Sequence, residues 1–217
     1  MIFSALMREN CNVKRIMISL AVSRKMQIAD NDEPVDKFDI WILYEGNKMS
    51  TPIEIERKYV IKMPDFDTLA GQDNYTVSEI EQTYLESESH LTHRVRKRVY
   101  DGKIVYTETK KVRIDEVSSF EDERNIDERE YTELLKSIKP GTRTLTKTRH
   151  TFTFSGQIFE VDIYPEWTRS CIMETELEAR DTIVDIPSFI SIVKEVTGDK
   201  RYSNAAMSYD FPQEMCK

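Results

Sequence analysis

Two acidic residues and one basic residue alternate along a short stretch near residue 55. Glu54, Glu56 and Lys58 are separated by Ile55 and Arg57. Successive side chains of an extended strand point to opposite faces, so the three charged side chains would share one face. Two carboxylates can hold a divalent cation, and a neighbouring ammonium can bind an anion such as a phosphate chain. The spacing predicts metal-dependent phosphate chemistry, but a strand with one solvated, charged face would carry the same pattern.

Similar spacing recurs in later segments of the chain. Charged residues two positions apart occur at Arg94 and Arg96, Glu121 and Glu123, Lys147 and Arg149, Glu160 and Asp162, and Glu174 and Glu176. An open sheet with these faces in water would explain them by solubility alone. A closed antiparallel barrel would instead turn the faces inward, so that bases and carboxylates line one interior. Such an interior would bind a polyanion together with a metal ion.

The elements that would position these residues are mainly strands. Alternating apolar and polar residues predict strands at 91–99, 103–111, 144–154, 157–163 and 172–179, with hairpin turns at Asp101-Gly102 and Ser155-Gly156. Apolar spacings of three and four predict a short helix that begins near Ile126 and ends near Pro140, and a second helix from Pro187 to Gly198. The chain has no glycine-rich phosphate loop, so side chains would have to bind any phosphate.

The length of 217 residues indicates one domain with an appendage. Residues 1–48 contain four of the nine methionines and no sustained periodicity, whereas the charged strand follows directly after Met49-Ser50-Thr51-Pro52. We therefore expect residues 1–48 to be an N-terminal extension outside the native protein, with the functional domain at 49–217. The alternative is an authentic N-terminal helix that packs on this domain.

Composition restricts the class of partner. The net charge of −8, with 32% charged residues, argues against nucleic-acid binding through a basic surface and favours a small-molecule partner. Charged residues interrupt the apolar stretches near the N-terminus, so we expect neither a membrane span nor a secretory signal. Cys11, Cys171 and Cys216 are odd in number and lack metal-ligand spacing, which favours a reducing, cytoplasmic location.

The segment Glu54-Ile55-Glu56-Arg57-Lys58 resembles the ExExK signature of the CYTH superfamily, the triphosphate tunnel metalloenzymes. The resemblance covers about residues 53–208 and continues, in the family's usual order, at Gln82-Thr83-Tyr84-Leu85, Arg94 and Arg96, Lys110, Glu121 and Glu123, Leu145 to Arg149, Val161-Asp162, Glu174 to Leu177, and Glu195 to Asn204. It implies an α+β fold in which an eight-stranded antiparallel closed β-barrel carries a few flanking helices.

The resemblance also implies roles for individual residues. Triphosphate would bind Lys58, Arg94, Arg96, Lys110 and Arg149. The acidic set would hold Mg²⁺ or Mn²⁺ or orient water: Glu54, Glu56, Glu121, Glu123, Asp162, Glu174 and Glu176. Lys147, near Tyr84, would activate the attacking water. The register leaves open whether Lys110 or Lys111 faces inward, and we assign Lys110. Ser119 and Asn125 depart from the family's charged pattern, which leaves the metal preference open.

The function implied is divalent-metal-dependent hydrolysis of a triphosphate, with inorganic tripolyphosphate as the expected substrate. Thiamine triphosphate or nucleoside triphosphate hydrolysis and the class IV adenylate cyclase reaction remain alternatives on the same fold. A non-catalytic triphosphate-binding module is an alternative of another class. The sequence does not decide the oligomeric state, and a homodimer remains one option.

Overall fold

The structure, a computed structural model, describes residues 53–89 and 91–215. These residues belong to a compact unit that begins at Ile53. The extension predicted at residues 1–48 and the start predicted at Met49 lie outside the described residues, so both stay predictions.

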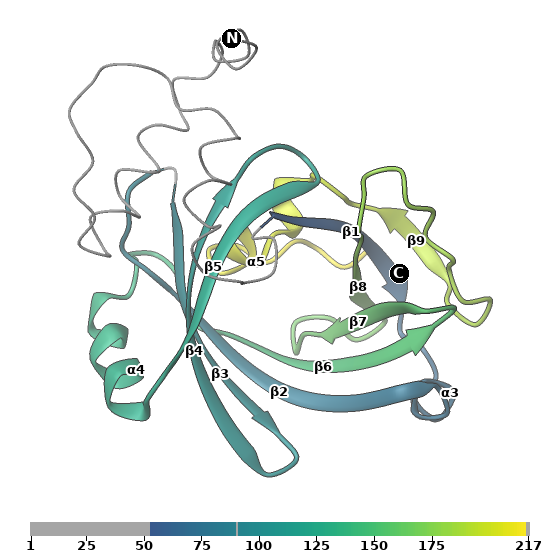
Figure 1. The fold of residues 1–217 in the computed structure, drawn as a ribbon, viewed down its shortest axis with the longest axis horizontal. Helices are drawn as coiled ribbons and strands as arrows, with labels where there is room; N and C mark the ends of the chain where they lie inside the picture. Colours follow the sequence, from purple (N-terminus) through teal and green to yellow (C-terminus); the bar gives the residue numbers. More distant parts are fainter. Residues whose placement is uncertain (1–52, 90, 216–217) are drawn as a thin grey trace, which may run out of the picture. The chain divides into compact units, whose positions relative to one another are not determined.

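Eight antiparallel strands form the predicted closed barrel (Figure 1). Their order is β5-β4-β3-β2-β6-β7-β8-β1, and the ring closes where β5 pairs with the first residues of β1. A ninth strand, β9, pairs with β1 further along, at Tyr59 to Ile61. The strands are β1 (Ile53–Lys62), β2 (Asp73–Leu85), β3 (Thr92–Tyr100), β4 (Lys103–Arg113), β5 (Ser118–Ile126), β6 (Leu145–Phe154), β7 (Gln157–Ile163), β8 (Ser170–Glu176) and β9 (Ile192–Glu195).

Two tight hairpins set the register of the neighbouring strands. Asp101 and Gly102 join β3 to β4 with φ values of 49° and 69°, and Ser155 and Gly156 join β6 to β7 with φ values of 49° and 78°. Positive φ at both central residues matches the right-handed twist of paired strands. Glycine reaches this region without steric cost, which explains its place second in each turn. The two predicted turns are confirmed.

The helices are short and lie outside the barrel strands. They are α3 (Phe66–Ala70), α4 (Glu128–Leu134) and α5 (Asn204–Met207), with 3₁₀ turns η1 (Leu135–Ser137) and η2 (Lys200–Tyr202). The Asp127 carboxylate accepts a hydrogen bond of 2.7 Å from the Glu130 backbone N–H and so caps α4. The helix predicted after Ile126 is confirmed.

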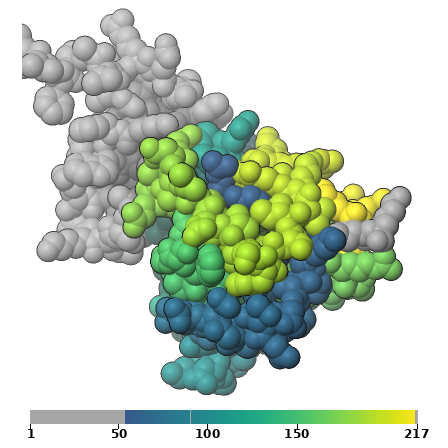
Figure 2. All heavy atoms as spheres, turned by 90° about the vertical axis from the view of Figure 1, so that its right-hand side faces the viewer, coloured from purple at the N-terminus to yellow at the C-terminus, as the bar shows by residue number. Residues whose placement is uncertain are grey.

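The helix predicted from Pro187 to Gly198 is wrong. This segment makes a turn in which the Ile190 N–H donates to the Pro187 carbonyl, and then forms β9. Beyond its pairing with β5, β1 offers free backbone groups on that edge, and β9 satisfies them; the Val196 N–H also donates to the Lys58 carbonyl. An apolar spacing over so few residues fits either a helix turn or an edge strand. Pairing with β1 decides which of the two forms. Figure 2 shows the yellow-green segment after β8 spread beside the blue atoms of the early strands.

Three apolar clusters hold the barrel. Two lie on the outer face of the strands: one includes Phe152, Phe159 and Leu69 of α3, and the other packs Val95 against Tyr131 of α4. The third fills the barrel interior at one end, where inward residues of the strands meet residues of the C-terminal segment. We call it the C-terminal plug, and its buried members are Val60, Tyr84, Leu145, Tyr164, Trp167, Ile172, Val196, Tyr202 and Met207.

Among residues 53–89 and 91–215, no helix combines the length and the apolar character needed to cross a bilayer.

Candidate active site

The strand register places the alternating charged residues on one face of the barrel wall. Residues directly opposite each other in paired strands point to the same side. The register pairs Glu56 with Glu176, Lys58 with Glu174, Glu174 with Glu160, and Arg149 with Asp162. Because the ring of strands is closed and apolar clusters cover much of its outer face, this charged face is the inner one.

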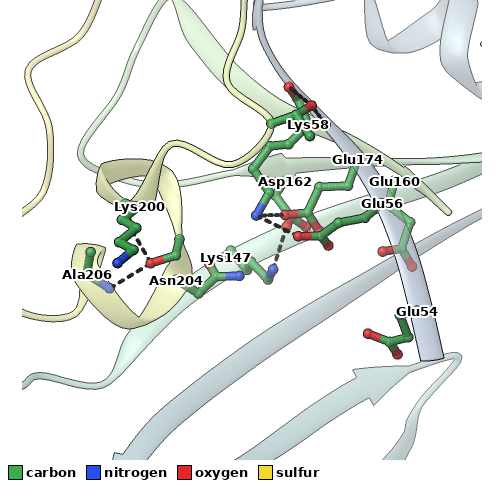
Figure 3. A network of polar contacts seen from close by, with 12 residues as sticks. Glu54, Glu56, Lys58, Lys147, Glu160, Asp162, Glu174, Lys200, Asn204 and Ala206 are labelled. Atoms are coloured by element: carbon green, nitrogen blue, oxygen red, sulfur yellow. Dashed lines mark hydrogen bonds and ion pairs between the residues drawn. The ribbon is translucent and has the colours of Figure 1, made fainter. Parts of the chain in front are cut away.

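Lys58 and Glu174 form one centre of the inner wall. The Lys58 Nζ lies 2.8 Å from one Glu174 oxygen and 3.7 Å from the Glu56 carboxylate. The other Glu174 oxygen lies 3.2 Å from the Arg149 guanidinium. Burial opposes ionisation of the Glu174 carboxyl, but Lys58 and Arg149 outweigh it and hold its pKa well below the usual range. Figure 3 shows Lys58 of β1 and Glu174 of β8 pointing toward one another, with Glu56 of β1 beside them.

Asp162 joins two further bases. It is fully buried, and its oxygens accept hydrogen bonds of 2.6 and 2.7 Å from the Arg149 Nε and Nη2. The Lys147 ammonium donates to the same carboxylate, and Arg149 also pairs with Glu160. The metal-ligand role predicted for Asp162 stays a prediction; its contacts here orient bases.

Lys147 is buried, and its surroundings shift its pKa in opposite directions. Burial and the neighbouring Arg149 charge favour the neutral amine, whereas Asp162 favours the ammonium, and the balance lowers the pKa of Lys147 to about 8. Its Nζ lies 5.8 Å from the centre of the Tyr164 ring. A lysine amine with such a pKa can accept a proton near neutral pH.

A second group of acids and bases lies where β5 closes onto β1. The Arg94 guanidinium lies 2.5 Å from Glu121, and the Lys111 ammonium lies 2.8 Å from Glu121 and 3.0 Å from Glu54. Burial raises the pKa of Glu54, and the nearby Glu121 adds to that effect. Burial also disfavours ionised Glu121, but Arg94 and Lys111 prevail and lower its pKa.

Acids and bases from seven of the eight barrel strands, all except β2, therefore face one interior. The closed antiparallel barrel therefore encloses a tunnel lined by charged side chains. Both the strand architecture and the inward charges that the family resemblance implied are present in it.

The comparisons with known proteins give partial likenesses. No family model and no curated protein matches this chain. The tunnel is similar to a solved structure described as the inorganic triphosphatase NE1496, with 27% identity over 77% of this chain and 100% of that one, and a TM-score of 0.48. It is also similar to the PH1819 protein of Pyrococcus horikoshii, with 21% identity over 59% and 80% of the two chains and a TM-score of 0.48. A protein from Hippeastrum, described as a putative adenylyl cyclase with a dominant triphosphatase activity, shares 16% identity over 58% and 80%, with a TM-score of 0.40. At TM-scores below 0.5, these likenesses by themselves establish neither fold nor activity.

The inward orientation predicted for Lys110 is wrong by one residue. Lys111 is paired with Glu121 and Thr92, and these share the face of Arg94. Lys110 is paired with Asp122 and His93, which point to the other side. Adjacent strand residues alternate between faces, so only one of the two lysines can face the tunnel.

Arg96, Glu123 and Tyr84 also lie on the inner face. The Arg96 guanidinium lies 3.9 Å from Glu123 and 3.5 Å from the Gln82 side-chain oxygen. The Gln82 amide donates a 2.7 Å hydrogen bond to the Tyr84 hydroxyl. Tyr84 was predicted to act beside Lys147; the aromatic ring beside the Lys147 ammonium is that of Tyr164.

The described part of the chain contains no ready-made cluster of three or more His, Cys, Asp or Glu side chains for a metal ion. Most of the tunnel carboxylates instead bind bases. Glu176 is the exception that matters for a cation, because burial and the charges of Glu160, Glu121 and Glu56 raise its pKa. This concentration of carboxylate oxygens has the chemistry that Mg²⁺ or Mn²⁺ prefers.

Sequence reasoning missed two residues of the tunnel, Tyr164 and Arg98. It noted that Glu160 shares a face with Asp162 but gave it no role, and it assigned Lys110 in place of Lys111. Strict alternation from Arg94 and Arg96 would have identified Arg98. Lys111 required the register of β4 against β5. Tyr164 follows the last residue of β7, so its orientation depended on the C-terminal plug.

Proposed function

We propose that this protein binds a triphosphate inside the tunnel and hydrolyses it with the help of a divalent cation, with inorganic tripolyphosphate as the preferred substrate. The observation that carries the proposal is the buried network of Lys58, Glu174, Arg149, Asp162 and Lys147. Figure 3 labels four of its members, Lys58, Glu174, Asp162 and Lys147. Five ionisable groups are expensive to bury together unless a ligand uses them. If these residues only stabilised the fold, apolar residues at the same positions would do so equally well.

The ion pairs of the network can exchange partners when substrate enters. Arg94, Arg149 and Lys58 each contact a carboxylate within 3.2 Å. Phosphate oxygens offer the same bidentate geometry to arginine as a carboxylate does. Substrate oxygens would therefore replace the carboxylates as partners of these bases. The released carboxylates would then be able to bind a cation.

Glu56, Glu121, Glu160 and Glu176 fit a cation because they place several carboxylates around one region of the tunnel. Glu54, Glu123 and Glu174 lie on the same inner face and complete the predicted acidic set, apart from Asp162. When bound, Mg²⁺ or Mn²⁺ would neutralise charge that develops on the phosphate oxygens.

Lys147 is the candidate proton acceptor for the attacking water. The water oxygen forms a bond to the terminal phosphorus, the bridging P–O bond breaks, and pyrophosphate leaves as phosphate is formed. One proton of the water passes to the neutral Lys147 amine. Asp162 then stabilises the ammonium that results, because it already accepts a hydrogen bond from this nitrogen.

The C-terminal plug supports a compact inorganic substrate. Tyr84, Tyr164 and Trp167 are at most 5% exposed, so apolar packing fills the barrel at that end. A short phosphate chain is bound by the charged wall alone, whereas a nucleoside or thiamine group requires additional room.

The test is to supply the purified full chain with tripolyphosphate, ATP or thiamine triphosphate, with Mg²⁺ or Mn²⁺. We expect phosphate release from tripolyphosphate and its loss when EDTA removes the metal. Cyclic AMP from ATP would support the cyclase instead. Metal-enhanced binding without turnover at any pH would identify a binding module.

Glu56→Gln tests the acidic set within the same assay. Removing one charge from the carboxylates should abolish turnover while the circular dichroism spectrum and melting temperature stay close to those of the parent. Full activity in this variant would contradict a role for Glu56 in holding the cation.

A further inference from the structure

Arg98 is a third arginine on the inner face of β3. It follows Arg94 and Arg96 at the same spacing, and the register places it opposite Ile80 of β2 and Val105 of β4. Ile80 in turn lies opposite Lys147 on β6. Arg98 therefore belongs to the tunnel wall, two strands from the candidate proton acceptor.

Two neighbours hold the Arg98 guanidinium in place. Its Nε donates a 3.0 Å hydrogen bond to the hydroxyl of Ser78, a residue that is 1% exposed. Its central carbon lies 5.7 Å from the centre of the Tyr100 ring. These contacts use the Nε and one face of the planar group, so the terminal nitrogens can donate to a further acceptor.

Arg98 differs from the other tunnel bases in its charge compensation. Each of the others has a carboxylate nearby: Lys58, Arg94, Lys111, Lys147 and Arg149 pair closely, and Arg96 lies 3.9 Å from Glu123. Over residues 53–89 and 91–215, the contacts of Arg98 are to Ser78 and Tyr100, with no carboxylate among them. A half-buried, positioned guanidinium of this kind favours an anionic ligand.

The position of Arg98 along the tunnel indicates which anion. Arg98 lies four residues after Arg94 on the strand, which is about 13 Å at the usual rise. This is longer than a triphosphate, whose end phosphorus atoms are only two bridges apart. Arg94 lies opposite Tyr84 of the C-terminal plug, whereas Val105, opposite Arg98, is 42% exposed. A longer chain would therefore extend toward Arg98, away from the plug.

We infer that Arg98 and Ser78 form an additional anion subsite, which binds the fourth phosphoryl group of a linear polyphosphate. The inference rests on the proposed function, because it assumes that the first three phosphoryl groups occupy the Lys58, Arg94 and Arg149 region. It extends the substrate class from tripolyphosphate to longer inorganic chains.

The test measures binding of tripolyphosphate and of tetrapolyphosphate by calorimetry, without added metal, so that turnover does not enter the readout. Arg98→Gln should weaken tetrapolyphosphate binding about tenfold more than tripolyphosphate binding, as expected for one charge-assisted contact. Lys97→Gln is the matched control, because Lys97 pairs with Glu81 on the outer face. It should change neither affinity by more than about twofold.

Arg98→Lys separates charge from packing, since it keeps the cation and loses the geometry of the bond to Ser78. It should retain most of the preference for tetrapolyphosphate, and a loss as large as that of Arg98→Gln would overturn the subsite. Equal weakening of both ligands by Arg98→Gln, or no weakening, would overturn the inference and leave the proposed function standing. Failure of the parent protein to bind either ligand would overturn both.

Discussion

Individual residues of the tunnel are defined by which face of a strand they occupy. Lys110 and Lys111 are chemically equivalent neighbours, yet only Lys111 lies within 3.0 Å of both Glu54 and Glu121. Contacts of this kind join the walls of β1, β4 and β5. The side chain's contribution to binding therefore follows from its orientation and not from its charge alone.

Substituting these two lysines separately tests the register. Lys111→Gln removes a base from the tunnel and leaves two acids without it, so affinity for tripolyphosphate should fall about tenfold. Lys110→Gln, on the outer face, should leave the affinity within about twofold. Titration calorimetry with tripolyphosphate measures both, and a larger effect at Lys110 would contradict the assigned orientation.

Lys147→Arg tests proton transfer separately from charge. The guanidinium stays protonated and can still pair with Asp162, but it cannot accept a proton from water. We expect kcat to fall about 100-fold or more, with tripolyphosphate affinity retained. Steady-state kinetics together with calorimetry provide the comparison. An unchanged kcat would remove Lys147 from the proposed proton transfer.

At the scale of elements, β3, β4 and β5 use both faces for charged contacts. On the outer face, Glu108 of β4 lies 2.7 Å from the His93 ring nitrogen of β3 and pairs with Arg124 of β5. The hydrogen bond from His93, with the Arg124 charge, lowers the pKa of Glu108 to about 2 although burial opposes this. The three strands are thereby joined by one carboxylate outside the tunnel.

Glu108→Gln should destabilise the barrel in a pH-dependent way. A carboxyl with a lowered pKa contributes its full stability above the unfolded pKa near 4.3 and loses that contribution as the pH falls toward 2. We expect a loss of about 1–3 kcal/mol at pH 7 that shrinks toward pH 3.

Urea unfolding at the two pH values measures this difference. Glu133→Gln is the control, because Glu133 pairs with Lys136 in solvent on α4 and η1, with its side chain 71% exposed. That variant should change stability by less than about 0.5 kcal/mol at either pH. A Glu108→Gln effect that grew at low pH would contradict the assigned shift.

At the scale of the whole molecule, the tunnel depends on closure in two places. The pairing of β5 with β1 closes the wall. The C-terminal plug fills one end with residues from distant parts of the chain, such as Val60 of β1 and Met207 of α5. Both closures bring together distant parts of the sequence. Losing either would expose the charged interior to water.

Met207→Ala tests the plug. Met207 is fully buried, so the variant leaves a cavity and should destabilise the protein by about 2–5 kcal/mol. Ile183→Ala, at a residue 86% exposed, should cost less than about 0.5 kcal/mol. Chemical unfolding monitored by Trp fluorescence compares the two variants, and equal effects would contradict the role given to the plug.

Much of the barrel follows from local sequence. Alternation in the segments at 103–111 and 157–163 predicted β4 and β7, and Asp101-Gly102 and Ser155-Gly156 predicted their hairpins, because side-chain period and turn conformation are local properties. The same alternation identified Arg94, Glu121 and Arg149 as residues that share a face. Closure of the barrel, by contrast, was implied by the family resemblance.

Tertiary structure decided what depends on pairing between distant segments. Lys111 was distinguished from Lys110 only by the register of β4 against β5, and residues 192–195 became a strand because β1 offered an unpaired edge. The partners of Asp162 and the place of Tyr164 beside Lys147 likewise arise from segments that meet only in the folded chain. The sequence by itself determined which residues carry charge and which alternate, since these are set within a few residues. Which of those charges meet was determined by long-range packing, because that depends on the register and closure of the whole barrel.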